Sequence, residues 1–216
     1  MGKRHSLLAA LGLMAIVASS GGCTFVAQTI GAIEGHEIVP AKFNGLEGKR
    51  VAVVCIDVNS LYGPGDEADL LARGVSTQLS QNVKNIKMVK QSEIHDWIDQ
   101  QDQALVDFRN VGRGVKADMV IGIDLNSIST RDVGTLLQGK ANIAVKVFDM
   151  SRPDEPVYEK PPTVMEFPEH GGRHVTENEA NFRVMFLRIL ADKITKDFYA
   201  HDRTLDFGRD ATYIGD

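Results

Sequence analysis

The chain has 216 residues, a formal net charge of −5 at pH 7 and two cysteines. This length fits one domain with a tail, and a chain of this size buries a core without needing disulfides or metals. The mild acidity argues against nucleic acid as a partner, because phosphate binding requires a clustered basic face.

The first 22 residues have the pattern of a signal peptide. Lys3 and Arg4 form a positive start, the apolar stretch 7–18 follows, and small residues fill 19–22. As a helix rising about 1.5 Å per residue, the apolar stretch would cover about 18 Å, well short of the ~30 Å hydrocarbon core of a bilayer. We therefore expect residues 1–22 to be a signal peptide and not a membrane-spanning helix.

Cys23 directly follows Gly21 and Gly22. This arrangement resembles the lipobox of bacterial lipoprotein precursors, in which a Cys after small residues becomes the acylated first residue. The resemblance implies a lipid such as palmitate on Cys23, and several acyl chains together hold a protein stably at a membrane. The alternative is ordinary cleavage near residues 18–20, which would leave Cys23 as a free or paired thiol. Residues 23–48, broken by Gly and Pro, are expected to form a tether.

The folded domain is expected to begin with a strand over residues 49–58. This run is almost continuously apolar, which is typical of a strand in the middle of a sheet covered on its faces. Cys55 lies within it and is expected to be a buried free thiol. The elements expected next are a helix over 66–81 with Leu70 in its buried stripe, a strand over 86–90, a helix capped by Ser92, and a helical stretch over 105–115.

A long hairpin is predicted over residues 117–148. Met119, Ile121, Ile123 and Leu125 recur at every second position, and the segment 138–148 repeats that alternation. A period of two with many β-branched residues indicates half-buried strands and not helices. Two such runs joined by a polar turn predict a long antiparallel hairpin.

A short strand over residues 157–160 is predicted after the hairpin. Pro161 and Pro162 are expected to end it, and the residues up to 175 are expected to form a surface loop. Thr176 with Glu179 has the spacing of a capping box and predicts the start of a long final helix. The domain is thus expected to cover residues 49–200, with a polar tail over 201–216.

The order of these elements resembles a lipoprotein group that includes the amino-terminal domain of TolB, the curli-secretion protein CsgG and the activator LpoB. The segments that carry the resemblance are Val51–Asp57, Ile86–Glu93, Lys116–Asp124, Val145–Asp149 and Val157–Glu159. It implies an α/β (α+β) fold: a mixed sheet with a long antiparallel hairpin and helices packed on it. It implies no catalytic residues, since members of the group act by binding proteins or assembling pores.

The densest group of possible metal ligands consists of Glu166, Glu169, His170 and His174. A metal site requires convergent ligands with a supporting second shell. The two histidines lie in a Gly-rich segment, and no helix places them on one face. We therefore expect a solvated loop here and no metal, with these four residues as the weak candidates.

Two glycine patterns imitate nucleotide-binding motifs. Residues 134–140 have the spacing of a phosphate loop but place Ala141 after the lysine and precede a strand. Residues 112–117 run from a helix into a strand, the reverse of the dinucleotide-binding order. Asp57 and Asp124 have only their strand-end positions to suggest paired carboxylates. No cofactor and no catalytic residue is therefore expected.

The sequence thus predicts a non-catalytic lipoprotein of the bacterial cell envelope that binds or scaffolds other proteins. Its expected partners are the membrane, through a lipid on Cys23, and unidentified envelope proteins; an oligomer is possible. The expected location is lipid-anchored and facing the periplasm. Two alternatives stay open, namely an exported soluble domain that binds a small ligand and a hydrolase with an unrecognised site.

Overall fold

The computed structural model describes residues 37–58, 65–101, 106–132, 136–168, 173–174 and 179–204. These residues form two units, one over 40–200 and a small one from both ends of the chain. In the small unit, β1 (Ile38–Val39) pairs antiparallel with β8 (His201–Asp202). The two strands come from the segments predicted as tether and tail. The predicted signal peptide and Cys23 lie outside the described residues.

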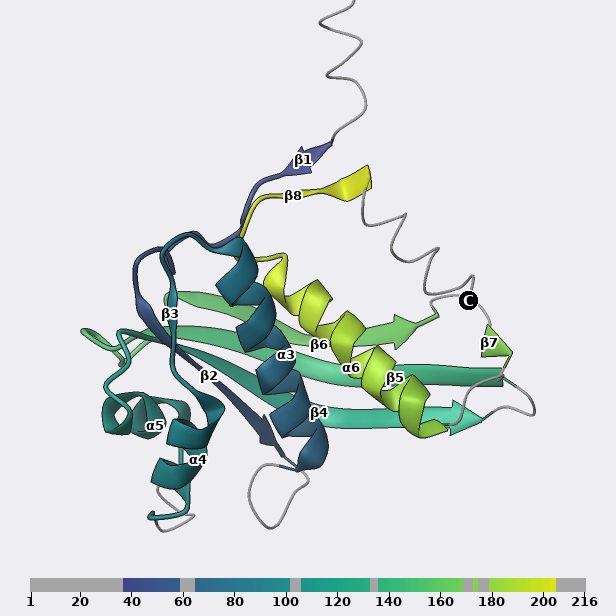
Figure 1. Cartoon of the computed structure of the whole chain (residues 1–216), viewed down its shortest axis with the longest axis horizontal. Helices are drawn as coiled ribbons and strands as arrows, with labels where there is room; N and C mark the ends of the chain where they lie inside the picture. The colour runs from purple at the N-terminus through teal and green to yellow at the C-terminus, as the bar shows by residue number, and fades with distance from the viewer. Residues whose placement is uncertain are drawn as a thin grey trace, which may run out of the picture. The chain divides into compact units, whose positions relative to one another are not determined.

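The larger unit is built on a mixed sheet whose strands lie in the order β3-β2-β4-β5-β6 (Figure 1). β2 runs parallel to β3 and β4, whereas β4, β5 and β6 follow one another antiparallel; β7 pairs with the start of β5. The strand bounds are β2 Arg50–Asp57, β3 Lys87–Met88, β4 Met119–Asp132, β5 Leu136–Asp149, β6 Tyr158–Phe167 and β7 Arg173–His174. The predicted α/β class and the long β4–β5 hairpin are confirmed.

Helices pack on both faces of this sheet. α3 (Asp66–Asn82) and α6 (Glu179–Thr195) pack side by side over one face, where α3 lies on β2 and α6 on β5 (Figure 1). α4 (Gln91–Ile98) and α5 (Phe108–Gly114) cover part of the other face, where they bury alternate strand residues such as Ala52. Because β2 is covered on both sides, its side chains from Val51 to Cys55 are all buried, as the continuous apolar run predicted.

Two local predictions for the helices are wrong. Leu70 of α3 is 44% exposed, and the smaller residues Ala68 and Ala72 join the buried stripe in its place. α4 begins at Gln91, two residues earlier than a Ser92 cap requires, and its N-cap Lys90 makes no side-chain capping bond. In both places the tertiary packing outweighs the local preference of the sequence.

The predicted surface loop after Pro161 is in fact strand. β6 continues through both prolines to Phe167, and its register against β5 shifts between Ile143 and Val145. Proline lacks an N–H for a strand ladder, but a strand at the edge of a sheet tolerates it, particularly at a bulge. Beyond the shift, Met165 and Phe167 are buried, whereas Val164 before them is exposed and Glu166 between them is partly exposed, which is the alternation of a half-buried strand.

Two aromatic rings lie directly on strand backbone at glycines. A Cβ atom on Gly139 of β5 would lie 2.5 Å from Cγ of Phe186 in α6, and one on Gly122 of β4 would lie 2.5 Å from Cδ2 of Phe108 in α5. Only glycine allows such a close approach. These contacts seat one helix on each face of the β4–β5 hairpin.

Candidate functional site

The structure describes only part of the group of predicted metal candidates. The carboxylate of Glu166 lies 2.6 Å from Nζ of Lys140 on the neighbouring strand. Glu169 and His170 lie outside the described residues, and His174 is placed only through the backbone pairing of β7. Among the described residues, no group of three or more His, Cys, Asp or Glu could hold a metal ion. The absence of a metal site stays a prediction.

Asp57 and Asp124 lie close to Cys55 in the structure. They are one step apart in the β2–β4 ladder, where Ile56 is the partner of Asp124. Burial raises the pKa of the Cys55 thiol, and the negative charges of Asp57 and Asp124 raise it further. Since the thiolate is the nucleophilic form, the burial and the raised pKa both lower the reactivity of this thiol. The prediction that Cys55 is a buried free thiol is confirmed.

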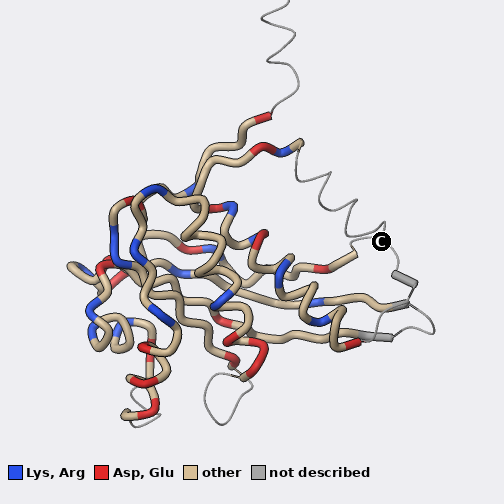
Figure 2. The backbone as a smooth tube through the Cα atoms, in the orientation of Figure 1, with Lys and Arg blue, Asp and Glu red and all other residues tan. Residues whose placement is uncertain are grey.

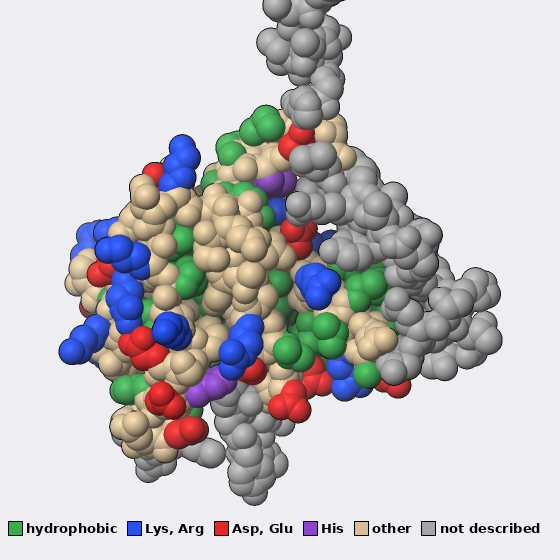
Figure 3. All heavy atoms as spheres, viewed as in Figure 1, with side chains coloured by type: hydrophobic (Ala, Val, Ile, Leu, Met, Phe, Trp, Pro, Cys, Tyr) green, Lys and Arg blue, Asp and Glu red, His purple; other side chains and the backbone are tan. Residues whose placement is uncertain are grey.

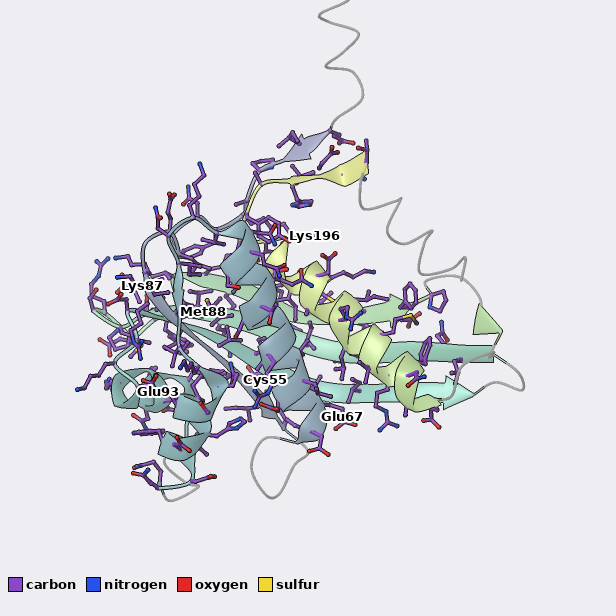
Figure 4. The ribbon with its side chains drawn as sticks, viewed as in Figure 1. Cys55, Glu67, Lys87, Met88, Glu93 and Lys196 are labelled. Atoms are coloured by element: carbon purple, nitrogen blue, oxygen red, sulfur yellow. The ribbon has the colours of Figure 1, made fainter. Side chains whose placement is uncertain are left out.

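The open edge of the sheet at β3 is the feature best suited to an interaction. β3 is the last strand in the order, and within the described residues β2 alone pairs with it. The N–H of Lys87 donates to Lys49 O, directly before β2, at 2.9 Å, and the N–H of Val89 donates to Val51 O of β2 at 2.8 Å. Because successive residues of a strand point their backbone groups to opposite sides, the N–H and C=O of Met88 point away from β2. Lys87 and Met88 are labelled on β3 in Figure 4.

A groove with a volume of about 520 Å³ runs beside this edge, between α3 and the chain from β3 into α4. Gln91 at the start of α4 fixes one wall of the groove. Its side chain is buried, and its Nε2 donates to Val53 O of β2 (3.0 Å) and to Ser76 Oγ of α3 (3.2 Å). These hydrogen bonds link α4 to both β2 and α3. The residues that line the groove are Arg73, Ser76, Thr77, Ser80, Met88, Val89, Lys90, Gln91 and Ser92.

The surroundings of β3 are basic in a chain that is acidic overall. Lys84, Lys87 and Lys90 recur at every third position without an intervening acid, and all three are exposed. None of them forms an ion pair with a residue that the structure describes, whereas Arg73 across the groove is paired with Asp69 (2.7 Å). Basic residues follow this part of the tube in Figure 2, and Figure 3 shows blue side chains gathered over it. The edge thus carries an unneutralised positive charge.

A buried ionic network stabilises the end of α6. The carboxylate of Asp197, only 5% exposed, accepts hydrogen bonds from Lys42 (2.7 Å), Lys160 (2.7 Å) and the Tyr158 hydroxyl (3.1 Å). Burial raises the pKa of Asp197, but the hydrogen bonds and positive charges of Lys160 and Lys42 outweigh it and bring that pKa below its ordinary value of 3.8. Since the backbone oxygen of Asp197 also accepts from Lys42 N and Phe43 N, the network joins the start of the larger unit to its end.

No helix among the described residues is long and apolar enough to cross a membrane.

No family model and no curated protein matches this chain. Solved structures that resemble it include the lipoprotein GNA1162 from Neisseria meningitidis, with 11% identity, coverage of 68% of this chain and 98% of that one, and a TM-score of 0.43. The PelC dodecamer from Paraburkholderia phytofirmans has 9% identity, coverage of 77% of this chain and 98% of that one, and a TM-score of 0.44. The LpoB C-terminal domain from Salmonella enterica has 15% identity, coverage of 56% of this chain and 85% of that one, and a TM-score of 0.37. LpoB is also one of the proteins in the group that the sequence resembles.

The sequence interpretation did not identify β3 as an open edge of the sheet, and it missed the Asp197 network. For the edge, a signal was present in the three evenly spaced lysines, which accompany a strand that was predicted. For the network, Lys42, Lys160 and Asp197 are far apart in the chain, and their pairing follows only from the fold.

Proposed function

We propose that this protein is a lipoprotein of the bacterial cell envelope, anchored through acyl chains on Cys23 and facing the periplasm. Its folded domain is a non-catalytic module that binds other envelope proteins. The signal peptide pattern and the Gly-Gly-Cys sequence at residues 21–23 support the anchor. The anchor keeps the domain close to the membrane, where its partners are also found.

The observation that carries the binding role is the β3 edge. Exposed strand edges are ready templates for an added strand, and folded proteins normally cover or blunt them. β3 offers outward backbone groups at Met88 next to a groove, and Lys87 and Lys90 beside it lack acidic partners among the described residues. These properties suit a surface that a partner completes, and they supply none of the convergent acids, bases or nucleophiles that catalysis requires.

Mass spectrometry of the mature amino terminus tests the anchor. The protein isolated from the membrane fraction is expected to begin at Cys23 and to carry acyl chains. Cys23→Ser should move the protein out of the membrane fraction, because two or more acyl chains are what hold such a protein stably at a bilayer. Cys55→Ala serves as the control, since it removes the other cysteine and should leave the protein on the membrane. A mature chain that begins at Gly21 or Thr24 without lipid would contradict the proposal.

A further inference from the structure

We propose that the β3 edge binds an acidic, extended segment of a partner protein, which adds a strand to the sheet beside Met88. This inference rests on the proposed binding function and specifies the chemistry of the partner. It draws on three properties of one place: the outward backbone groups of β3, the adjacent groove and the unpaired lysines.

The backbone of β3 sets the shape of the ligand. With Lys87 N and Val89 N engaged with β2, Met88 presents one donor and one acceptor on the outer side of the strand. An extended chain satisfies such groups with its own C=O and N–H, which is the mode of recognition known as strand addition.

The side chains on the two sides of the edge set the charge of the ligand. Met88 is the ladder partner of Val51, and Lys87 is the partner of Arg50, so these neighbours point to opposite faces of the sheet. Lys90 lines the groove, as does Arg73 in its ion pair with Asp69, whereas Lys87 lies on the opposite face. A strand lying here therefore meets cations on both of its faces, and acidic side chains at successive positions would match them.

The groove favours a peptide over a membrane surface as the occupant. It is about 520 Å³ in volume and is lined by the hydroxyl groups of Ser76, Thr77 and Ser80. The Thr77 and Ser80 hydroxyls donate to the backbone of their own helix, which leaves their oxygens able to accept from a ligand. A lipid headgroup layer would use the lysines but would leave the groove and the Met88 backbone groups unfilled.

Peptide binding to the full-length protein in detergent tests this inference. The probe is a blocked, fluorescent peptide of Glu and Thr about as long as an ordinary strand, and the comparison peptide carries Lys in place of Glu. The acidic peptide is expected to bind, and rising salt concentration is expected to weaken this binding because the charges are exposed. Lys87→Gln with Lys90→Gln should weaken binding roughly fivefold or more. The matched control, Arg152→Gln with Arg188→Gln, removes the same charge from exposed positions elsewhere and should leave binding unchanged.

A backbone substitution tests the strand addition itself. Met88→Pro removes the outward N–H but leaves both bonds to β2 in place, and an edge strand tolerates proline. We expect this substitution to weaken binding of the acidic peptide roughly tenfold, whereas Met88→Leu should bind the peptide like the wild type. In the wild type, hydrogen exchange of the Met88 amide should slow when the peptide is added. Peptide binding that is insensitive to both Met88→Pro and the lysine pair would overturn the inference.

Two further outcomes separate this inference from the proposed function. If vesicles containing phosphatidylglycerol bind through Lys87 and Lys90 while the acidic peptide does not, the patch serves lipid and the inference is wrong. If the full-length protein captures the same envelope proteins with and without the Met88→Pro and lysine substitutions, the inference fails but the binding function stands.

Discussion

Replacing Phe186 with alanine is expected to lower the free energy of unfolding by about 3–5 kcal/mol. The Phe186 ring is fully buried in α6 and lies against the backbone of Gly139 in β5. Its removal leaves a cavity between the helix and the sheet, and the rigid strand cannot move in to fill it. Denaturation of the wild type and the variant in urea, followed by circular dichroism, measures the difference.

The control for this substitution lies in the same helix. Val184 is 47% exposed, so Val184→Ala should change the free energy of unfolding by less than about 0.5 kcal/mol. A loss below about 1 kcal/mol for Phe186→Ala would mean that α6 does not pack on the β5 backbone in the way described.

Replacing Asp197 with asparagine is expected to destabilise the protein by about 3 kcal/mol at neutral pH. The substitution leaves Lys160, whose side chain is only 19% exposed, without its counter-charge at 2.7 Å, and it weakens the hydrogen bond from Tyr158. Glu166→Gln provides the control, because it breaks an ion pair with Lys140 that is largely exposed. Such exposed pairs contribute at most about 1 kcal/mol.

The difference in unfolding free energy between the wild type and Asp197→Asn should depend on pH in a defined direction. The pKa of Asp197 is lower in the folded protein than its ordinary value of 3.8. The carboxylate therefore stabilises the folded state fully above that ordinary value, and this contribution is lost as the pH falls through the lower folded pKa. The difference in unfolding free energy should be constant between about pH 7 and 5 and should shrink below about pH 4. A difference that grows at low pH would contradict the network.

The sequence was sufficient for the elements whose pattern is strong. The alternation of Met119, Ile121 and Ile123 fixes which face of β4 is buried, and the apolar run around Cys55 indicates a strand covered on both sides. Each strand residue faces either the core or the other side of the sheet, so the type of each residue reports its own burial. The class of fold follows from these patterns, together with the order of strands and helices.

Other features depend on neighbours that the sequence does not identify. Pro161 and Pro162 indicate the end of a strand only if both sides of that strand must be hydrogen-bonded, and β6 has β5 on one side alone among the described strands. Leu70 matches a helical stripe, but α6 packs beside α3 at a close contact between Gly74 and Ala191 and leaves Leu70 outside. In each case the missing information is which element lies next to which.

The proposed site at the β3 edge also depends on neighbours that the sequence does not identify. Lysines at every third position usually indicate a solvated surface, and the interpretation changes only when Met88 is known to lie on the last strand of the sheet. The groove needs the additional fact that Gln91 ties α4 to both β2 and α3. A strand position, a helix packing and a charge pattern thus have to coincide before an interaction surface can be recognised.

Site-specific photo-crosslinking in intact cells tests the central claim most directly. A photoreactive residue at Ser92 lies in the groove beside β3 without removing a charge, and one at Val164 lies on β6 at the opposite end of the strand order. We predict that irradiation joins the chain to a distinct envelope protein from position 92 and not from position 164. Adducts from position 164 alone, or no protein adduct from position 92, would contradict the claim that this domain binds a partner through its β3 edge.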